Sequence, residues 1–184
     1  MVSDRQTRCD RTCRARADNP ARRSSFRLLA AIGMSLGLAP VHKWAQKPAY
    51  EAMLLSCIDP RFVDPVHIYM NARGLDGKYS QFTIAGAAIA VEANAFASWR
   101  QTFWDNLATS IELHKIKKVI AIDHRDCGAA RIAYGLQSVA NASVETDTHK
   151  RVLASFRQDV QRRHPGVRVE TGLMALDGSI EMFI

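Results

Sequence analysis

Apolar residues from position 52 onward fall into short runs, each bounded by polar or turn-forming residues. Ala52-Met-Leu-Leu-Ser-Cys-Ile58 and Lys118-Val-Ile-Ala-Ile122 have the length and composition of strands that are buried on both faces. Residues 79–84 alternate between apolar and polar side chains, and Asp177-Gly178 is a tight-turn signal between two further runs. Strands are therefore expected over 52–58, 79–84, 118–122, 167–176 and 179–184.

Helical spacing separates these runs. Phe96, Trp99, Phe103, Leu107 and Ile111 recur at intervals of three and four residues, which predicts an amphipathic helix over 95–114. The other helices are expected over 65–73, 127–135 and 147–163. Alternating strands and helices predict an α/β fold with a mainly parallel central sheet, helices on both of its faces and an antiparallel C-terminal edge strand.

Composition places this chain of 184 residues among ordinary soluble globular proteins, since 47% of its residues are hydrophobic and 23% are charged. The formal net charge of +7 is concentrated at the N-terminus, where residues 1–27 hold eight arginines against three aspartates. The rest of the chain carries no basic stripe with interleaved aromatic residues. Nucleic acid is therefore not expected as a partner.

Residues 1–45 are predicted to be a basic tail that contains an export signal. Arg22-Arg23 precedes an apolar run over 28–40, a pattern that resembles a twin-arginine signal. As a helix, this run would extend about 20 Å, short of the ~30 Å hydrocarbon core, so no stable membrane span is expected. The predicted location is periplasmic or otherwise exported, and otherwise cytoplasmic. The alternatives for the tail are a disordered arm or an N-terminal helix that packs on a partner subunit. Cys9 and Cys13 would be removed with the signal.

Two motifs in the body carry chemistry. Cys57-Ile-Asp59-Pro-Arg61 follows the first predicted strand, and His124-Arg-Asp-Cys127 follows the third. Because ligand sites in open α/β sheets form at the carboxyl ends of the strands, both motifs are expected in one crevice. Two thiolates and an imidazole form a Cys₂His set with one open position, which is a catalytic arrangement for zinc.

The neighbouring residues suggest how such a site would work. Zinc lowers the pKa of bound water from 15.7 to about 7 and so provides a hydroxide that attacks an electrophilic carbon. Asp59 would orient the hydroxide by accepting its hydrogen bond, and Arg61 would keep Asp59 ionised. The helix that starts after Cys127 is expected to favour the thiolate of that residue, and the N–H of Gly128 to hold a bicarbonate oxygen.

These motifs, at this separation, resemble those of the β-class carbonic anhydrases, and the resemblance spans roughly residues 50–184. It implies that residues 46–184 form a zinc domain in which Cys57, His124 and Cys127 bind one Zn²⁺ per chain. Asp59 would either pair with Arg61 or, in a closed state, become the fourth zinc ligand. The resemblance further implies a homodimer or a dimer-based oligomer.

Two single positions and one loop depart from the family. Pro60 stands where serine is usual, and Asp123 where glycine is usual before the histidine. The loop over 84–90 reads Ile-Ala-Gly-Ala-Ala-Ile-Ala in place of an Arg-Asn-Ala-Gly-Asn sequence. These changes leave the metal set intact and alter the substrate pocket.

The expected function is the zinc-dependent, reversible hydration of carbon dioxide to bicarbonate, a lyase reaction on a small-molecule substrate. An alternative is hydrolysis of a carbon dioxide analogue, carbonyl sulfide or carbon disulfide. A non-catalytic zinc-binding member of the same fold is a further alternative. Two others use no metal: a thiol-redox protein with His124 as base, and a structural oligomer whose cysteines are merely buried.

Overall fold

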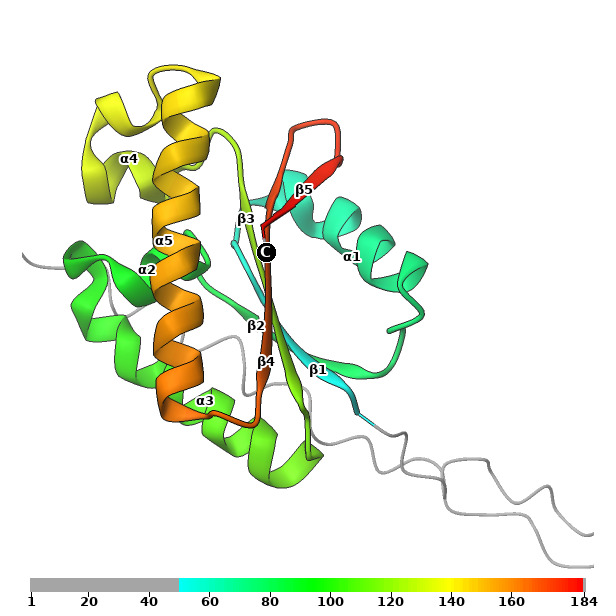
Figure 1. Cartoon of the computed structure of the whole chain (residues 1–184). Coiled ribbons are helices and arrows are strands. Elements are labelled where there is room, and N and C mark those ends of the chain that lie inside the picture. Colours follow the sequence, from blue (N-terminus) through cyan, green and yellow to red (C-terminus); the bar gives the residue numbers. More distant parts are fainter. Residues whose placement is uncertain (1–49, 184) are drawn as a thin grey trace, which may run out of the picture. The chain divides into compact units, whose positions relative to one another are not determined.

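A five-stranded sheet forms the centre of the protein in the computed structural model, which describes residues 50–183 (Figure 1). The strand order is β2-β1-β3-β4-β5. The first four strands are parallel to their neighbours, and β5 is antiparallel to β4. The strands are β1 (Ala52–Ser56), β2 (Tyr79–Thr83), β3 (Lys118–His124), β4 (Arg168–Met174) and β5 (Ile180–Phe183). The predicted mixed sheet with an antiparallel C-terminal edge is therefore confirmed.

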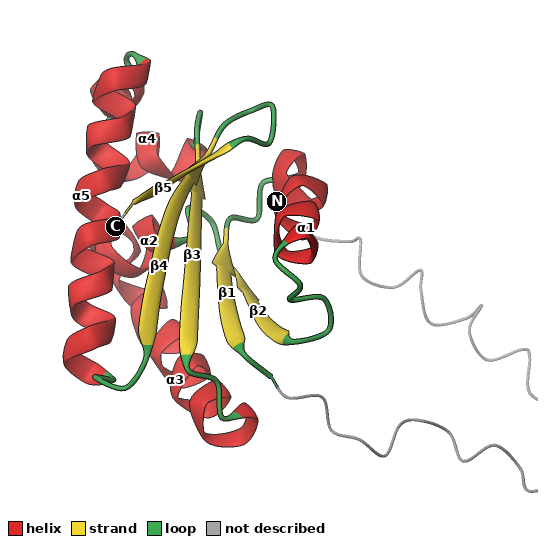
Figure 2. Cartoon of the chain, turned by 45° about the vertical axis from the view of Figure 1, so that its right-hand side comes forward, coloured by secondary structure: helices red, strands yellow, loops and turns green. Residues whose placement is uncertain are grey.

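Helices cover both faces of this sheet (Figure 2). One face is covered by α1 (Val63–Ala72). The other face is covered by α2 (Ala88–Glu92), α3 (Ala97–His114), α4 (Gly128–Tyr134) and α5 (Ala142–Arg163). Short 3₁₀ turns lie at Pro60–Phe62, Asn94–Phe96 and Leu136–Val139. No helix in the described range, 50–183, has both the length and the apolar character that a membrane crossing needs.

The side chains of the central strands alternate between two apolar clusters. Met53 and Leu55 of β1 pack in the larger cluster, beneath α2, α3 and α5, whereas Leu54 packs beneath α1. In β3, Ala121 and Ile122 divide between the two clusters in the same way. Burial on both faces explains why these strands are continuous apolar runs in the sequence.

Element boundaries differ from expectation where local hydrogen bonds override the apolar period. α1 begins at Val63, so Asp64 lies within its first turn and is not the N-cap. α5 begins at residue 142, five positions earlier than predicted, because the Asn141 side chain accepts a hydrogen bond from the N–H of Val144. The short helix α2 lies in the segment that was expected to be a loop. The predicted tail of residues 1–45, with Cys9 and Cys13, lies outside the described residues.

Phe103 of α3 occupies the centre of the larger cluster. Its ring centroid lies 5.6 Å from that of Phe82, 5.0 Å from that of Trp104 and 5.4 Å from that of Phe156. The side chain is fully buried. It therefore joins α3, α5 and strand β2 in one packed unit.

Replacing Phe103 by alanine is expected to lower the free energy of unfolding by about 3–5 kcal/mol, because it leaves a cavity among the three rings. Urea denaturation monitored by circular dichroism measures this change. Leu113→Ala is the matched control on the same helix, since Leu113 is 68% exposed, and it should change stability by less than about 0.5 kcal/mol. Equal effects of the two substitutions would contradict this account of the core.

Candidate metal centre

Cys57, His124 and Cys127 converge at the carboxyl edge of the sheet. β1 and β3 are adjacent and parallel, with Ser56 paired to Ile122, so both strands end on the same side. Cys57 directly follows β1, His124 is the last residue of β3, and Cys127 precedes α4. The two sulfur atoms and a histidine nitrogen all lie within 4.8 Å of one another. The two sequence motifs therefore meet in one site, as the strand order predicted.

The imidazole of His124 is oriented for metal binding. Its Nδ1 lies 2.8 Å from the carbonyl oxygen of Arg125, and because a carbonyl only accepts, Nδ1 carries the hydrogen. Nε2 is buried and has no hydrogen-bond partner among the described residues, so its lone pair is free. The ring of Phe62 stacks on the imidazole at a centroid distance of 4.1 Å. A histidine whose second nitrogen is fixed by a carbonyl is typical of a metal ligand.

The two thiols differ in their protonation. The pKa of Cys57 is lowered by the Cys127 thiol and the N–H of Gly86, which donate hydrogen bonds to its sulfur, and by the neighbouring His124, against the opposing effect of burial. The Gly86 nitrogen lies 3.1 Å from Cys57 Sγ. The pKa of Cys127 is raised because its thiol donates to Cys57 and because it is buried. The N-terminus of α4 acts in the expected direction, since a hydrogen bond from the Ala130 backbone lowers the pKa of Cys127, but without a metal Cys57 and burial outweigh it.

Asp59 and Arg61 form a bidentate ion pair beside these ligands. Arg61 Nη2 lies 2.7 Å from Asp59 Oδ2, and Arg61 Nε lies 3.0 Å from Asp59 Oδ1. Arg61 also donates through Nη1 to Asp126 Oδ2 at 2.9 Å. The guanidinium therefore joins the two loops of the site. Because both oxygens of Asp59 face Arg61, the structure shows the paired arrangement and not the one in which Asp59 joins the ligand cluster.

Pro60 has a local structural role. It is the first residue of the 3₁₀ turn, where a missing N–H costs nothing. A proline also restricts the preceding residue to extended backbone, and Asp59 has φ −60° and ψ 120°. From this conformation Asp59 Oδ1 accepts a hydrogen bond from the N–H of Arg61 at 3.0 Å. Pro60 therefore preorganises the Asp59 carboxylate toward Arg61.

A cavity of about 410 Å³ opens over the ligand cluster. Its polar groups are those of the candidate site, and its other walls are mostly apolar. The lining residues are Cys57, Ile58, Asp59, Pro60, Ala85, Phe96, Trp99, His124, Gly128, Ala129 and Ile132. Gly128, which was predicted to contact substrate, therefore lies at the cavity wall. Such a lining favours a small apolar substrate.

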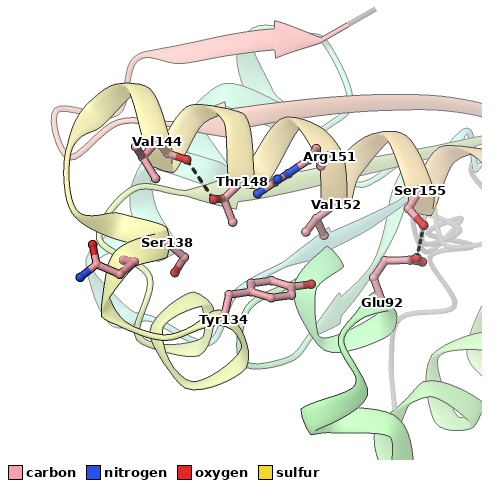
Figure 3. Close-up of a pocket in the computed structure, with 9 residues that line it drawn as sticks. Glu92, Tyr134, Ser138, Val144, Thr148, Arg151, Val152 and Ser155 are labelled. Carbon is pink, nitrogen blue, oxygen red and sulfur yellow. Dashed lines mark hydrogen bonds between the residues drawn. The ribbon is translucent and has the colours of Figure 1, made fainter.

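A second cavity, of about 630 Å³, lies between α5 and the segment that contains Tyr134 and Ser138 (Figure 3). It is lined by Glu92, Tyr134 and residues of α5, among which Ser155 donates to Glu92 Oε2 at 2.6 Å. None of the predicted site residues borders it. Its larger volume therefore does not make it the candidate catalytic site.

Four residues of the site were not identified from the sequence. Gly86 donates to Cys57, Asp126 accepts from Arg61, and Asp123 is paired with His149. The unusual Ala-Gly-Ala sequence around Gly86 and the unusual Asp123 were visible as departures from the family. No signal connected His149, which lies on α5, to either of them.

Comparison with known proteins identifies the family. The sequence profile of the family described as "Putative carbonic anhydrase" matches residues 48–180, and the chain belongs to this family. An uncharacterised protein of Rickettsia conorii is 33% identical over 129 residues, which are 70% of this chain and 69% of that protein. An uncharacterised protein of Rickettsia bellii is 32% identical over 70% of this chain and 79% of its own length.

Solved β-carbonic anhydrases share the fold. An enzyme of Aspergillus fumigatus superposes with a TM-score of 0.51 and 14% identity, covering 73% of this chain and 76% of its own. The Coccomyxa enzyme in complex with acetazolamide gives 0.52 and 15%, covering 77% and 75%. One of two tetrameric enzymes of Sordaria macrospora gives 0.52 and 10%, covering 73% and 81%. The fold defined above is therefore that of the β-carbonic anhydrases.

Hydrogen bonds from Arg61 are the main reason that the pKa of Asp59 is lowered to about 2. Arg61→Ala is expected to raise this pKa toward the ordinary 3.8, and carbon-13 NMR titration of the carboxyl group in metal-free protein measures it. A lowered pKa means that the ionised pair stabilises the fold above pH ~4 and that this contribution is lost as pH falls through 2. Arg61→Lys keeps the charge without the paired hydrogen bonds, so the pKa of Asp59 in this variant should lie between those in wild type and in Arg61→Ala. An unchanged pKa in Arg61→Ala would contradict the assignment.

Proposed function

We propose that this protein is a zinc-dependent carbonic anhydrase that reversibly hydrates carbon dioxide to bicarbonate. The observation that carries the proposal is the convergence of Cys57, His124 and Cys127 beside a carboxylate that Arg61 keeps ionised. Membership of the carbonic anhydrase family supports it. Cys57 and His124 line a mostly apolar cavity, which supports it as well, since carbon dioxide is small and uncharged.

Cys57, Cys127 and Nε2 of His124 would hold one Zn²⁺ per chain. The donor set fits zinc, because two thiolates and one imidazole leave a coordination position open for water or substrate. When bound, zinc supplies a nucleophile at neutral pH by lowering the pKa of water to about 7. The carbonyl oxygen of Arg125 accepts a hydrogen bond from Nδ1 of His124. This keeps the tautomer in which the lone pair of Nε2 can bind a metal ion.

Asp59 would orient the nucleophile. Ionised aspartate only accepts hydrogen bonds, so at neutral pH Asp59 can take one from a hydroxyl group in the cavity that it lines. Arg61 holds the carboxylate in the ionised form and in a fixed direction. The N–H of Gly128 at the cavity wall would hold an oxygen of bicarbonate. Trp99 and Ile132, together with Ala129, supply apolar walls against which carbon dioxide packs.

One observation favours a second candidate reaction. The walls contributed by Ile58, Phe96 and Trp99 accommodate sulfur at least as well as oxygen, and the family's polar loop is replaced here by Ile84-Ala-Gly-Ala-Ala-Ile-Ala90. Carbonyl sulfide and carbon disulfide have the linear shape of carbon dioxide and are less polar. Hydrolysis of either by the same residues would release hydrogen sulfide. The oligomeric assembly and the export of the chain stay predictions from the sequence.

Purified protein is expected to contain one zinc per chain by mass spectrometry of the metal, and to hydrate carbon dioxide in a stopped-flow assay. Zinc removal by a chelator should abolish this activity, and zinc readdition should restore it. Hydrogen sulfide release from carbonyl sulfide or carbon disulfide, measured on the same preparation, decides between the two reactions. Stoichiometric zinc without either activity would indicate a non-catalytic member, and absence of zinc would contradict the proposal.

Asp59→Asn is expected to lower kcat for carbon dioxide hydration by about 100-fold or more, because the amide presents a donor where the nucleophile needs an acceptor. Zinc content should stay at one per chain, since Asp59 is outside the ligand cluster. Asp64→Asn removes an exposed carboxylate of α1 and is the matched control. A rate in Asp59→Asn equal to that of the control would exclude the proposed role.

A further inference from the structure

Two buried side chains of α5 reach the loop that carries His124 and Cys127. Glu145 and His149 lie one helical turn apart, and they contact the residues on either side of His124. Oε1 of Glu145 accepts a hydrogen bond from the N–H of Asp126 at 2.6 Å. Nδ1 of His149 lies 2.8 Å from Oδ2 of Asp123. One face of one helix therefore holds both ends of the ligand-bearing loop.

The contact of His149 with Asp123 continues to the opposite side of the site. The second carboxylate oxygen of Asp123, Oδ1, accepts a hydrogen bond from the N–H of Ala88 at 3.0 Å. Ala88 is the first residue of α2, and two residues before it the N–H of Gly86 donates to Cys57 Sγ. A continuous set of contacts thus connects His149 to a candidate metal ligand on a different strand.

The segment between Gly86 and Ala88 adopts its conformation against local preference. Ala87 has φ 48° and ψ −114°, a region that a residue with a Cβ adopts at a cost on the order of 1–3 kcal/mol. Gly86 has φ 85°, and a Cβ at this position would lie 2.6 Å from Cβ of Ala129. Such backbone persists only where its surroundings fix it. Backbone hydrogen bonds hold the segment locally, and the hydrogen bond from Ala88 to Asp123 is the one that joins its end to β3.

The Asp123–His149 pair is completely enclosed, with exposed side-chain fractions of 1% and 0%. A buried ionisable pair contributes little net stability compared with apolar residues of the same size. The pair instead fixes the orientation of the Asp123 carboxylate. Asp123 has two acceptor oxygens, and a donor on Oδ2 leaves Oδ1 turned toward Ala88. Without that donor the carboxylate is free to rotate, and the Ala88 bond is weakened.

We propose that His149 is a positioning residue for the metal centre, which acts through Asp123 and the strained segment 86–88 on the Cys57 sulfur. The proposal rests on the zinc site argued above, but it concerns contacts that exist between protein groups alone. It assigns a role to the aspartate that replaces the family's usual glycine. It also gives α5 a function at the site in addition to covering the sheet.

Two amide substitutions separate positioning from packing. The amide nitrogen of asparagine can occupy the place of histidine Nδ1, whereas that of glutamine reaches the place of Nε2. His149→Asn therefore keeps the donor to Asp123 while losing volume, and His149→Gln keeps more volume while misplacing the donor. Positioning predicts a zinc affinity close to wild type in His149→Asn and an affinity about 10–100-fold weaker in His149→Gln.

Zinc affinity is measured by competition with a chelating dye at fixed pH, with thermal melting of each variant to confirm that it is folded. A role in packing alone predicts the opposite order, since glutamine is closer to histidine in size than asparagine is. Equal affinities, or weaker binding in His149→Asn than in His149→Gln, would overturn the proposal. If His149→Gln does not fold, Asp123→Asn replaces one acceptor oxygen by a donor, and a comparable loss of affinity is expected from it.

Amide hydrogen exchange in metal-free protein tests the same contacts without zinc. The N–H groups of Gly86 and Ala88 should exchange at least tenfold faster in His149→Gln than in wild type, and near the wild-type rate in His149→Asn. If wild type binds no zinc, the proposed function fails, and the exchange rates alone decide whether His149 fixes this segment. Unchanged exchange at both amides in His149→Gln would overturn the positioning role.

Discussion

The register between β1 and β3 is the constraint on which the site depends. Ser56 pairs with Ile122, so Cys57 emerges one residue beyond the pair on one strand while β3 continues to His124 on the other. A shift of one residue would exchange the two faces of the shifted strand, so that its side chains would meet the wrong one of the two clusters. Burial on both faces therefore fixes the register, and the fixed register brings a thiolate and an imidazole from distant parts of the chain together. The geometry of the ligands is a consequence of core packing.

The fold and the convergence of Cys57, His124 and Cys127 follow from local patterns, which is why the sequence was sufficient to predict them. Continuous apolar runs mark doubly covered strands, and Cys57 and His124 stand where those runs end. The contacts between Asp123 and His149 and between Arg61 and Asp126 depend on where α5 and the His124–Cys127 loop dock, and residue spacing carries no information on this. The helix α2 itself was missed because a segment of five residues without a side-chain cap does not show a full apolar period.

The structure gives physical reasons for the positions at which this chain differs from the β-class motifs. Pro60 restricts the backbone of Asp59 to the conformation that faces Arg61, which a serine would not do. Asp123 introduces a buried carboxylate whose two oxygens have separate donors, Ala88 on one side and His149 on the other. In the altered loop, the N–H of Gly86 donates to Cys57 Sγ, and Ala85 lines the cavity. These changes alter the hydrogen bonds around the site and the lining of its cavity, while Cys57, His124 and Cys127 are retained.

Helix α5 belongs both to the core and to the surroundings of the ligands. Phe156 is enclosed with Phe103 and Trp104, and two turns earlier His149 contacts Asp123. A ligand that binds only the folded arrangement stabilises it by mass action. Under the proposed function, zinc binding to Cys57, His124 and Cys127 would therefore be thermodynamically linked to the docking of α5, and substitutions in the distant aromatic core would alter zinc retention without touching a ligand. On this proposal, a scarce zinc supply would lower the number of core mutations that the protein tolerates.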